Sequence, residues 1–202
     1  MSTSPLAEFA EGLRLRLRGI AEPSDLQLEA LHAHYELLLR WNPRLNLTRI
    51  TAIDEALERH YAESIFLAAQ LPAGVWKIAD VGSGAGFPGF PVAVLRPDCQ
   101  VTLIESHQRK AVFLREAARQ IANIAVFARR AEDVDEVFDW VISRAVSVSD
   151  LRDIAGRLGG NAALLGGPED LSRLPGFEWQ SLPMPWGIQR CLHIGVFSRD
   201  TE

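Results

Sequence analysis

The chemistry that stands out in this chain lies between Asp80 and Gly89, where one acidic side chain, four glycines and a proline occur within ten positions. The overlapping segment Lys77–Val81 has the pattern of a short buried strand. Glycine adopts positive φ and has no Cβ, so a ligand can lie directly against such a loop. Pro88 suits the first position of a helix, where its missing N–H costs nothing. Strand, glycine loop and helix N-terminus together predict a nucleotide-type pocket at the carboxyl end of a sheet.

Two interpretations of the loop compete. The run Gly84–Gly89 satisfies the G-x-G-x-x-G pattern of dinucleotide-binding enzymes. In that pattern the first glycine ends the strand, whereas here the strand ends at Gly82. Read from the strand end, Asp80–Gly86 resembles motif I of the class I S-adenosylmethionine (SAM) methyltransferases. The loop therefore favours SAM, bound against Gly82 and Gly84, with Asp80 ordering the loop or the ammonium group of SAM.

An NAD(P)-dependent oxidoreductase remains the alternative, and a purely structural glycine turn is the third possibility. The oxidoreductase would require a proton-relay tyrosine or lysine near the pocket. The two tyrosines of the chain, Tyr35 and Tyr61, both lie outside the predicted sheet.

Acidic residues follow the next two predicted strands. Glu105 ends the second strand, 23 positions after Gly82 (105 − 82) and close to the spacing of about 20 expected for an acid that binds ribose hydroxyls. A carboxylate suits this role because it accepts hydrogen bonds from both the 2′- and the 3′-hydroxyl. Ala131 and Glu132 follow the third strand, where SAM enzymes usually read the adenine. The sequence alone does not distinguish that role from an exposed acidic turn.

The segment after the fourth predicted strand, Val141–Ala145, is where methyltransferases keep residues for the acceptor group. It has neither the Asn/Asp-Pro-Pro-aromatic stretch of enzymes that methylate exocyclic amines nor a cysteine nucleophile. Cys99 and Cys191 fall far from the predicted pocket. An acceptor that needs little activation fits this sequence, such as guanine N7, which loses no proton on attack. Catalysis would then rest on proximity and alignment, and the catalytic residue is unknown, with Arg144 the one candidate.

Strands and helices alternate after position 74, which predicts an α/β fold of the Rossmann-like class, a mostly parallel sheet flanked by helices. We expect a single domain over 1–202, with a helical N-terminal extension at 1–73 and a SAM-binding core at 74–202. Pattern and capping signals predict helices at 6–17, from Ser24 onward, and at 54–70, 91–95, 109–121 and 148–157. Strands are expected at 77–81, 101–105, 124–127, 140–143, 162–165 and 191–197.

Composition agrees with an ordinary soluble domain. The 202 residues carry a net charge of −5, two cysteines and no apolar run approaching the roughly 18 residues that span a bilayer. The first residues lack the order of a signal peptide. We therefore expect a cytoplasmic monomer with reduced thiols, no membrane contact and no metal site, and any nucleic-acid partner must meet a local patch rather than the bulk charge.

Four segments together give a more specific resemblance: Trp41–Thr48, Arg59-His60, Asp80–Pro91 and Ile142–Ala145. They resemble the bacterial ribosomal RNA small-subunit methyltransferase G family, also called glucose-inhibited division protein B, which methylates N7 of a guanine in 16S rRNA with SAM. The resemblance implies 16S rRNA or the small ribosomal subunit as partner. The SAM contacts it implies are Gly82, Phe87, Ala131, Glu132 and Arg144.

The chain departs from the family pattern in several places. Glu63 and Glu105 stand where the family usually has aspartate. Gly166-Gly167 replaces a lysine-glycine pair, and Cys191 replaces a histidine. These changes bear on RNA contacts of the C-terminal third rather than on the cofactor site.

Positive charge in this chain is almost entirely arginine, since Lys77 and Lys110 are its two lysines. Guanidinium groups bind phosphates and stack on bases, as an rRNA partner would require. The expected RNA-binding patch is Arg44, Arg49, Arg59 and His60; a solvated helix face is the simpler alternative. A non-catalytic protein that binds both SAM and RNA also fits these residues.

Overall fold

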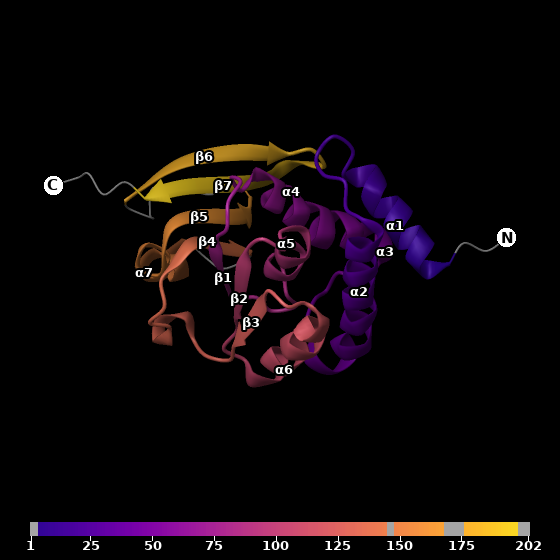
Figure 1. Ribbon diagram of the computed structural model, residues 1–202, viewed down its shortest axis with the longest axis horizontal. Helices are drawn as coiled ribbons and strands as arrows, with labels where there is room; N and C mark the ends of the chain where they lie inside the picture. Colours follow the sequence, from indigo (N-terminus) through magenta and orange to yellow (C-terminus); the bar gives the residue numbers. More distant parts are fainter. Residues whose placement is uncertain (1–3, 145–147, 168–175, 198–202) are drawn as a thin grey trace.

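Seven strands form one sheet in the computed structural model, which describes residues 4–144, 148–167 and 176–197 (Figure 1). The strand order is β3-β2-β1-β4-β5-β7-β6. The strands are β1 (Lys77–Val81), β2 (Gln100–Ile104), β3 (Ile124–Phe127), β4 (Phe138–Arg144), β5 (Gly159–Gly166), β6 (Phe177–Met184) and β7 (Gly187–Phe197). The first five pair in parallel, and β7 and β6 complete the edge in antiparallel pairing.

Helices occupy the connections and the N-terminal region. They are α1 (Pro5–Arg16), α2 (Asp25–Leu45), α3 (Ile53–Ala56), α4 (Glu63–Gln70), α5 (Gly89–Leu95), α6 (Gln108–Ala117) and α7 (Val148–Leu158). Short turns of other helical types are η1 (Leu57–Ala62, a π-helix), η2 (Ala118–Gln120) and η3 (Ala131–Asp133). The order confirms the predicted Rossmann-like α/β fold.

Successive side chains along each strand point to opposite faces of the sheet. Ile78, Leu103 and Ile142 belong to a large core shared with α1, α2 and α4–α6. Val81 and Val141 belong to a smaller core that α7 covers on the opposite face. In Figure 1 the indigo and purple helices accordingly stack on one side of the sheet and α7 lies on the other.

The N-terminal helices begin where capping residues predict. Ser4 caps α1 by accepting from the Ala7 N–H, and Ser24 with Gln27 forms a complete capping box on α2. Gln27 also donates from its side chain to the carbonyl of Val94 in α5, at 2.9 Å. The extension is thereby joined to the sheet-covering helices by packing and by a specific hydrogen bond.

Three predictions needed correction. Pro88 lies one position before the first residue of α5, which is Gly89. The N–H of Gly89 donates to Asp80, and a Cβ at Gly89 would have no room. The helix predicted at 54–70 is wound as a π-helix through Leu57–Ala62. Strand β6 was not predicted, since its edge position leaves most of its side chains exposed or half-buried and a proline stands at Pro183.

Among the described helices, none is long and apolar enough to cross a membrane. Likewise, the described residues contain no group of three or more His, Cys, Asp or Glu side chains placed to hold a metal ion.

Candidate functional site

Alternate glycines shape the loop that leaves β1. Gly82, Gly84 and Gly86 have φ of 71°, 55° and 92°, a conformation that side chains with a Cβ rarely adopt. At Gly84 a Cβ would meet only the carbonyl oxygen of Gly82, at 3.7 Å, so the space beside this residue is open. The loop therefore exposes its backbone at Gly84 without a side chain to block a ligand.

Asp80 holds this loop from beneath. Its side chain is fully buried, and Oδ2 accepts from the N–H of Gly89 at 3.0 Å. The Ser83 hydroxyl donates to the Asp80 carbonyl oxygen at 2.9 Å. Burial raises the pKa of Asp80 to about 7. Of the two roles predicted for Asp80, the geometry supports ordering of the loop, because the carboxyl group has no exposed surface for an ammonium group.

Glu105 joins the glycine loop to the end of β2. Its Oε2 accepts from the N–H of Gly84 at 2.9 Å, and its Oε1 accepts from the N–H of His107 at 2.7 Å. A carboxylate has about four acceptor positions, so each oxygen keeps a lone pair for a hydroxyl donor. The carboxylate thus fixes the loop and can still receive ribose hydroxyls.

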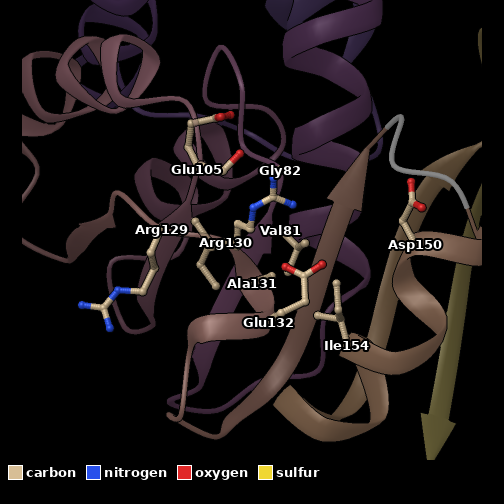
Figure 2. A pocket seen from close by; sticks show the side chains of 11 residues that line it. Val81, Gly82, Glu105, Arg129, Arg130, Ala131, Glu132, Asp150 and Ile154 are labelled. Atoms are coloured by element: carbon tan, nitrogen blue, oxygen red, sulfur yellow. The ribbon is translucent and has the colours of Figure 1, made fainter.

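A pocket of about 540 Å³ opens beside these residues (Figure 2), within the size range of small-molecule sites. Its walls come from the ends of β1 and β2, from η3 and from α7. The lining residues are Val81, Gly82, Ile104, Glu105, Ser106, Arg129, Arg130, Ala131, Glu132, Asp150 and Ile154.

Arginine side chains hold the pocket wall formed by η3 and lie beside it. Arg157 on α7 donates to the carbonyl oxygens of Val134 at 2.6 Å and Ala131 at 2.7 Å, which holds this turn in place. Arg130 points into the pocket in Figure 2, whereas Arg129 points away. The Arg129 guanidinium instead lies over the ring of Phe127, 5.1 Å from its centroid.

Phe87 and Arg144, both expected to contact SAM, do not line this pocket. Phe87 is 5% exposed and packs among aromatic rings behind the loop. It stacks on His60 with ring centroids 4.4 Å apart and meets the edges of His34 and Tyr61 at 5.2 Å each. Its ring therefore supports the loop from the side of the N-terminal helices.

His34 connects the N-terminal extension to the glycine loop. Its Nε2 donates to the carbonyl oxygen of Ala85 at 3.0 Å, and its Nδ1 accepts from the hydroxyl of Tyr61 at 2.8 Å. Burial lowers the pKa of His34 to about 3, which keeps the ring neutral as this donor and acceptor pattern requires. Helix α2 thus positions the loop directly.

The Trp-Asn…Asn-Leu-Thr segment has a structural explanation. Asn46 ends α2 in the left-handed conformation, with φ of 49°. The Asn42 side chain then donates to the carbonyl oxygen of Thr48 at 3.0 Å and accepts from its N–H at 2.9 Å. This closed turn places the Thr48 hydroxyl 2.8 Å from Nε2 of His60.

His60 in turn positions Arg144. Because a guanidinium only donates, the 2.8 Å contact between Arg144 and Nδ1 of His60 leaves the His60 proton on Nε2, facing Thr48. Burial, with a smaller contribution from Arg144, lowers the pKa of His60 to about 3. The ring is 5% exposed and both nitrogens are occupied. His60 therefore has no free ring nitrogen to offer RNA, and the direct RNA contact stays a prediction.

Glu63, absent from the predicted site, lies at the centre of an arginine cluster. Arg190 binds it with two hydrogen bonds, Nε to Oε1 at 3.1 Å and a terminal nitrogen to Oε2 at 2.7 Å. Arg59 and Arg144 approach it at 3.7 and 3.9 Å. No sequence signal predicts this arrangement, because Glu63 and Arg190 are 127 positions apart (190 − 63).

Four of the seven predicted SAM-contacting residues therefore share one pocket: Gly82, Glu105, Ala131 and Glu132. Gly84 adjoins them through its bond to Glu105. In the predicted RNA-binding patch, Arg44 at the end of α2 and Arg49 in the following loop are exposed. The Arg59 side chain is 37% exposed beside Glu63.

This chain is similar in sequence to proteins of a known family. The family model of rRNA small subunit methyltransferase G matches residues 27–161. Ribosomal RNA small subunit methyltransferase G of Xanthomonas campestris is 37% identical over 97% of this chain and 91% of its own length. The same-named protein of Rhodospirillum centenum is 45% identical over 64% of this chain, and that of Mycoplasma capricolum is 38% identical over 58%. These two matches span 61% and 53% of the relatives' lengths.

Solved structures share the fold at low sequence identity. A predicted O-methyltransferase from Agrobacterium tumefaciens superposes with a TM-score of 0.55 and 24% identity, over 68% of this chain and 81% of the other. The fibrillarin pre-rRNA processing protein of Methanococcus jannaschii gives a TM-score of 0.54 and 18% identity, over 68% and 74%. The fold is that of the class I SAM-dependent methyltransferases, and the chain belongs to the rRNA small subunit methyltransferase G family.

Proposed function

We propose that this chain transfers a methyl group from SAM to N7 of a guanine in 16S rRNA. The observation that carries the proposal is the pocket at the carboxyl ends of β1 and β2, where Glu105 holds the open glycine loop in place. This edge of an α/β sheet is where such folds bind nucleotide-like ligands. The family membership supplies the substrate class.

The residues of the pocket fit SAM. The loop backbone at Gly82 and Gly84 accommodates close approach, and the free lone pairs of Glu105 suit the two ribose hydroxyls. Ala131 and Glu132 on the η3 wall line the same pocket, and we assign the adenine to them. When bound, SAM supplies a methyl group on a positively charged sulfur. The chain's contribution is to hold that group and the acceptor in line and to exclude water.

Four titratable side chains beside the glycine loop are not free to remove a proton from an acceptor: Asp80, His60, Glu63 and Glu105. Asp80 is fully buried, and His60 is neutral with its Nδ1 occupied by Arg144. Glu63 is bound by Arg190, and Glu105 holds two backbone N–H groups. Guanine N7 attacks with a lone pair and loses no proton, so it needs no such base. This chemistry supports N7 over an exocyclic amine or a hydroxyl as the acceptor.

The oxidoreductase alternative is contradicted by the family match. The structure agrees, since Tyr61 is fully buried against His34 and the Tyr35 hydroxyl donates to the carbonyl oxygen of Thr51. Neither phenol lines the pocket.

The pH dependence of single-turnover methyl transfer tests the acceptor. With N7 as nucleophile, the rate of the transfer step should stay nearly flat over about pH 6.5 to 8.5. A steep rise with an apparent pKa near neutrality would contradict N7 and indicate proton abstraction from an amine or hydroxyl. RNA and SAM binding without any turnover would instead indicate the non-catalytic alternative.

A further inference from the structure

Three arginines from separate parts of the chain converge on the buried carboxylate of Glu63. Arg59 comes from the π-helical turn η1, Arg144 from the end of β4 and Arg190 from β7. The Glu63 side chain is 3% exposed, whereas those of Arg59, Arg144 and Arg190 are 37%, 11% and 25% exposed. The carboxylate therefore forms the floor of the cluster and the guanidinium groups form its outer part.

The cluster is not neutral. Three guanidinium groups against one carboxylate leave an excess of two positive charges (3 − 1), and the adjoining His60 adds none because its Nδ1 accepts from Arg144. This excess stands out in a chain whose net charge is −5. Burial lowers the pKa of Arg144 to about 10, so its surroundings disfavour its charge. A bound anion would relieve that cost.

Hydrogen bonding in the cluster is also incomplete. Arg190 forms both hydrogen bonds to the carboxylate, while Arg59 and Arg144 approach it only as charges at 3.7 and 3.9 Å. The Nε of Arg59 is buried and has no hydrogen-bond partner. An arginine held only for stability would be expected to use its buried donors. In this cluster the carboxylate leaves the guanidinium groups of Arg59 and Arg144 only partly satisfied.

Resting on the proposed function, we infer that Glu63 is a positioning residue that assembles Arg59, Arg144 and Arg190 into a preformed site for one phosphate group of the RNA backbone near the target guanine. Guanidinium groups bind phosphate oxygens with pairs of parallel N–H donors, which suits this geometry. Glu63 keeps the three positive charges together without a ligand, so little reorganisation is needed when RNA binds.

The location supports this inference. Arg144 follows Ser143, which pairs with Val81 immediately before the glycine loop. The ring of His60, which holds Arg144, stacks on Phe87 of that loop. A phosphate at the cluster would therefore lie next to the glycine loop, and none of the three arginines lines the SAM pocket. Arg190 lies outside the segment matched by the family model, so the inference assigns a substrate-binding role to the C-terminal hairpin.

The test measures the affinity of a 16S rRNA fragment at several salt concentrations for Arg190→Gln, Arg190→Lys and Lys77→Gln. Lys77 is exposed at the opposite, amino end of β1 and controls for the loss of one positive charge. Arg190→Gln should weaken RNA binding about 10-fold, the loss of a charge-assisted hydrogen bond, and reduce the salt slope by about 1. Arg190→Lys should retain the salt slope with intermediate affinity. Lys77→Gln should change neither.

Circular dichroism and SAM calorimetry on the same variants separate the outcomes. Native spectra and unchanged SAM affinity are expected for all three. If Arg190→Gln binds RNA with the affinity and salt slope of Lys77→Gln, the cluster is structural and the inference fails. A loss of SAM affinity without a change in RNA affinity would also overturn it, because the anion would then be the SAM carboxylate. Methyl transfer by the wild type, assayed in parallel, reports separately on the proposed function.

Discussion

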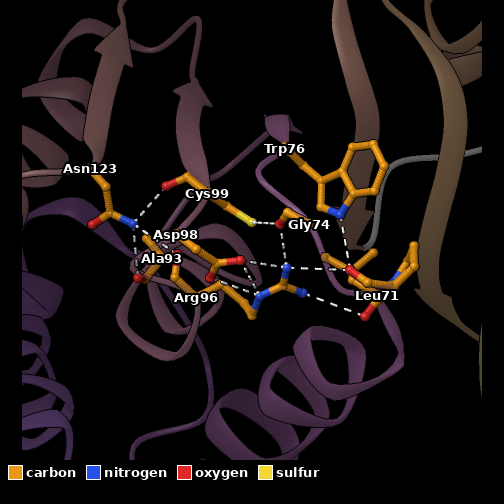
Figure 3. A network of polar contacts seen from close by, with 9 residues as sticks. Leu71, Gly74, Trp76, Ala93, Arg96, Asp98, Cys99 and Asn123 are labelled. Carbon is orange, nitrogen blue, oxygen red and sulfur yellow. Dashed lines mark hydrogen bonds and ion pairs between the residues drawn. The ribbon is translucent and has the colours of Figure 1, made fainter.

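Arginine side chains brace both ends of the sheet, but with different degrees of hydrogen bonding. At the amino end Arg96 donates to Asp98 and to the carbonyl oxygens of Leu71, Pro72 and Gly74 (Figure 3). Beside it, the Asn123 side chain donates to three further backbone carbonyls. At the carboxyl end, three arginines share the single carboxylate of Glu63.

The pKa directions express the same difference. The hydrogen bond to Asp98 raises the pKa of Arg96, whereas burial lowers the pKa of Arg144. An arginine whose donors all have acceptors stabilises the fold by holding loops together. An arginine with unused donors can form charge-assisted hydrogen bonds to a ligand. Changes at the carboxyl end should therefore affect function before stability, and changes at the amino end should do the reverse.

The largest effect is expected in the glycine loop. Gly84→Val should abolish SAM binding while the protein stays folded, because the new side chain extends into open space where the ligand must approach. Calorimetry with SAM and circular dichroism measure this. Gly19→Val is the matched control, since Gly19 also has positive φ (74°) and no atom within 4 Å of a built Cβ, but lies in the turn after α1. Native SAM affinity in Gly84→Val would refute the assignment of the cofactor site.

Arg144→Ala should reduce single-turnover methyl transfer about 100-fold while it lowers RNA affinity much less. The physical reason is misplacement of the reacting groups where the glycine loop meets the end of β4. Single-turnover rates and RNA titrations on the same preparation give the comparison. Equal losses in rate and RNA affinity would show that Arg144 acts through RNA binding alone and does not align the reacting groups.

Arg96→Ala should have the opposite character. It leaves three carbonyl oxygens and the Asp98 carboxylate without their donor, which should cost about 2–4 kcal/mol of unfolding free energy. Denaturant unfolding measures the loss, and SAM affinity of the folded fraction should be unchanged. A stable variant with impaired SAM binding would erase the distinction between the two ends of the sheet.

Asp80 gives a pH-dependent prediction. The folded-state pKa of Asp80, about 7, lies above its usual value. Between about pH 4 and 7 the Asp80 carboxyl is therefore protonated in the folded protein and ionised in the unfolded chain. The free energy of unfolding falls as pH rises through this range. Asp80→Asn cannot titrate, so its unfolding free energy should fall less steeply across that range, by up to about 1.4 kcal/mol per pH unit. Parallel pH profiles for the wild type and the variant would show no difference if Asp80 were ionised throughout.

The smallest effect is expected at the exposed end of α2. Arg44→Ala should weaken RNA binding a few-fold and reduce the salt slope by about 1, with SAM affinity intact. Titrations of SAM and of a 16S fragment at two salt concentrations suffice. An unchanged salt slope would show that this arginine belongs to a solvated face.

Prediction from the sequence succeeded where the signal is local. The glycine loop, the position of Glu105 after β2 and the capping box at Ser24 depend on residues close together in the chain, and the structure has all three. It failed where a long-range contact decides. Nothing near Phe87 shows that its ring turns toward His34 and His60 rather than toward the pocket.

The arginine cluster was missed for the same reason. The antiparallel pairing of β7 with β5 and β6 brings Arg190 to Glu63. The apolar pattern of β6 is too weak to predict the β6–β7 hairpin from the sequence. In the sequence Glu63 looks like an ordinary polar residue on a helix, although it is buried in the structure. Its partners become apparent only once the sheet is assembled.

The most direct test is to incubate the protein with 16S rRNA that lacks the modification and with SAM carrying an isotopically labelled methyl group. Mass spectrometry of the digested RNA then identifies the methylated atom. Our account predicts labelled 7-methylguanosine at a single site in the wild type and none with Gly84→Val. Labelled methyl on another atom, or none at all although SAM and RNA are both bound, would contradict it.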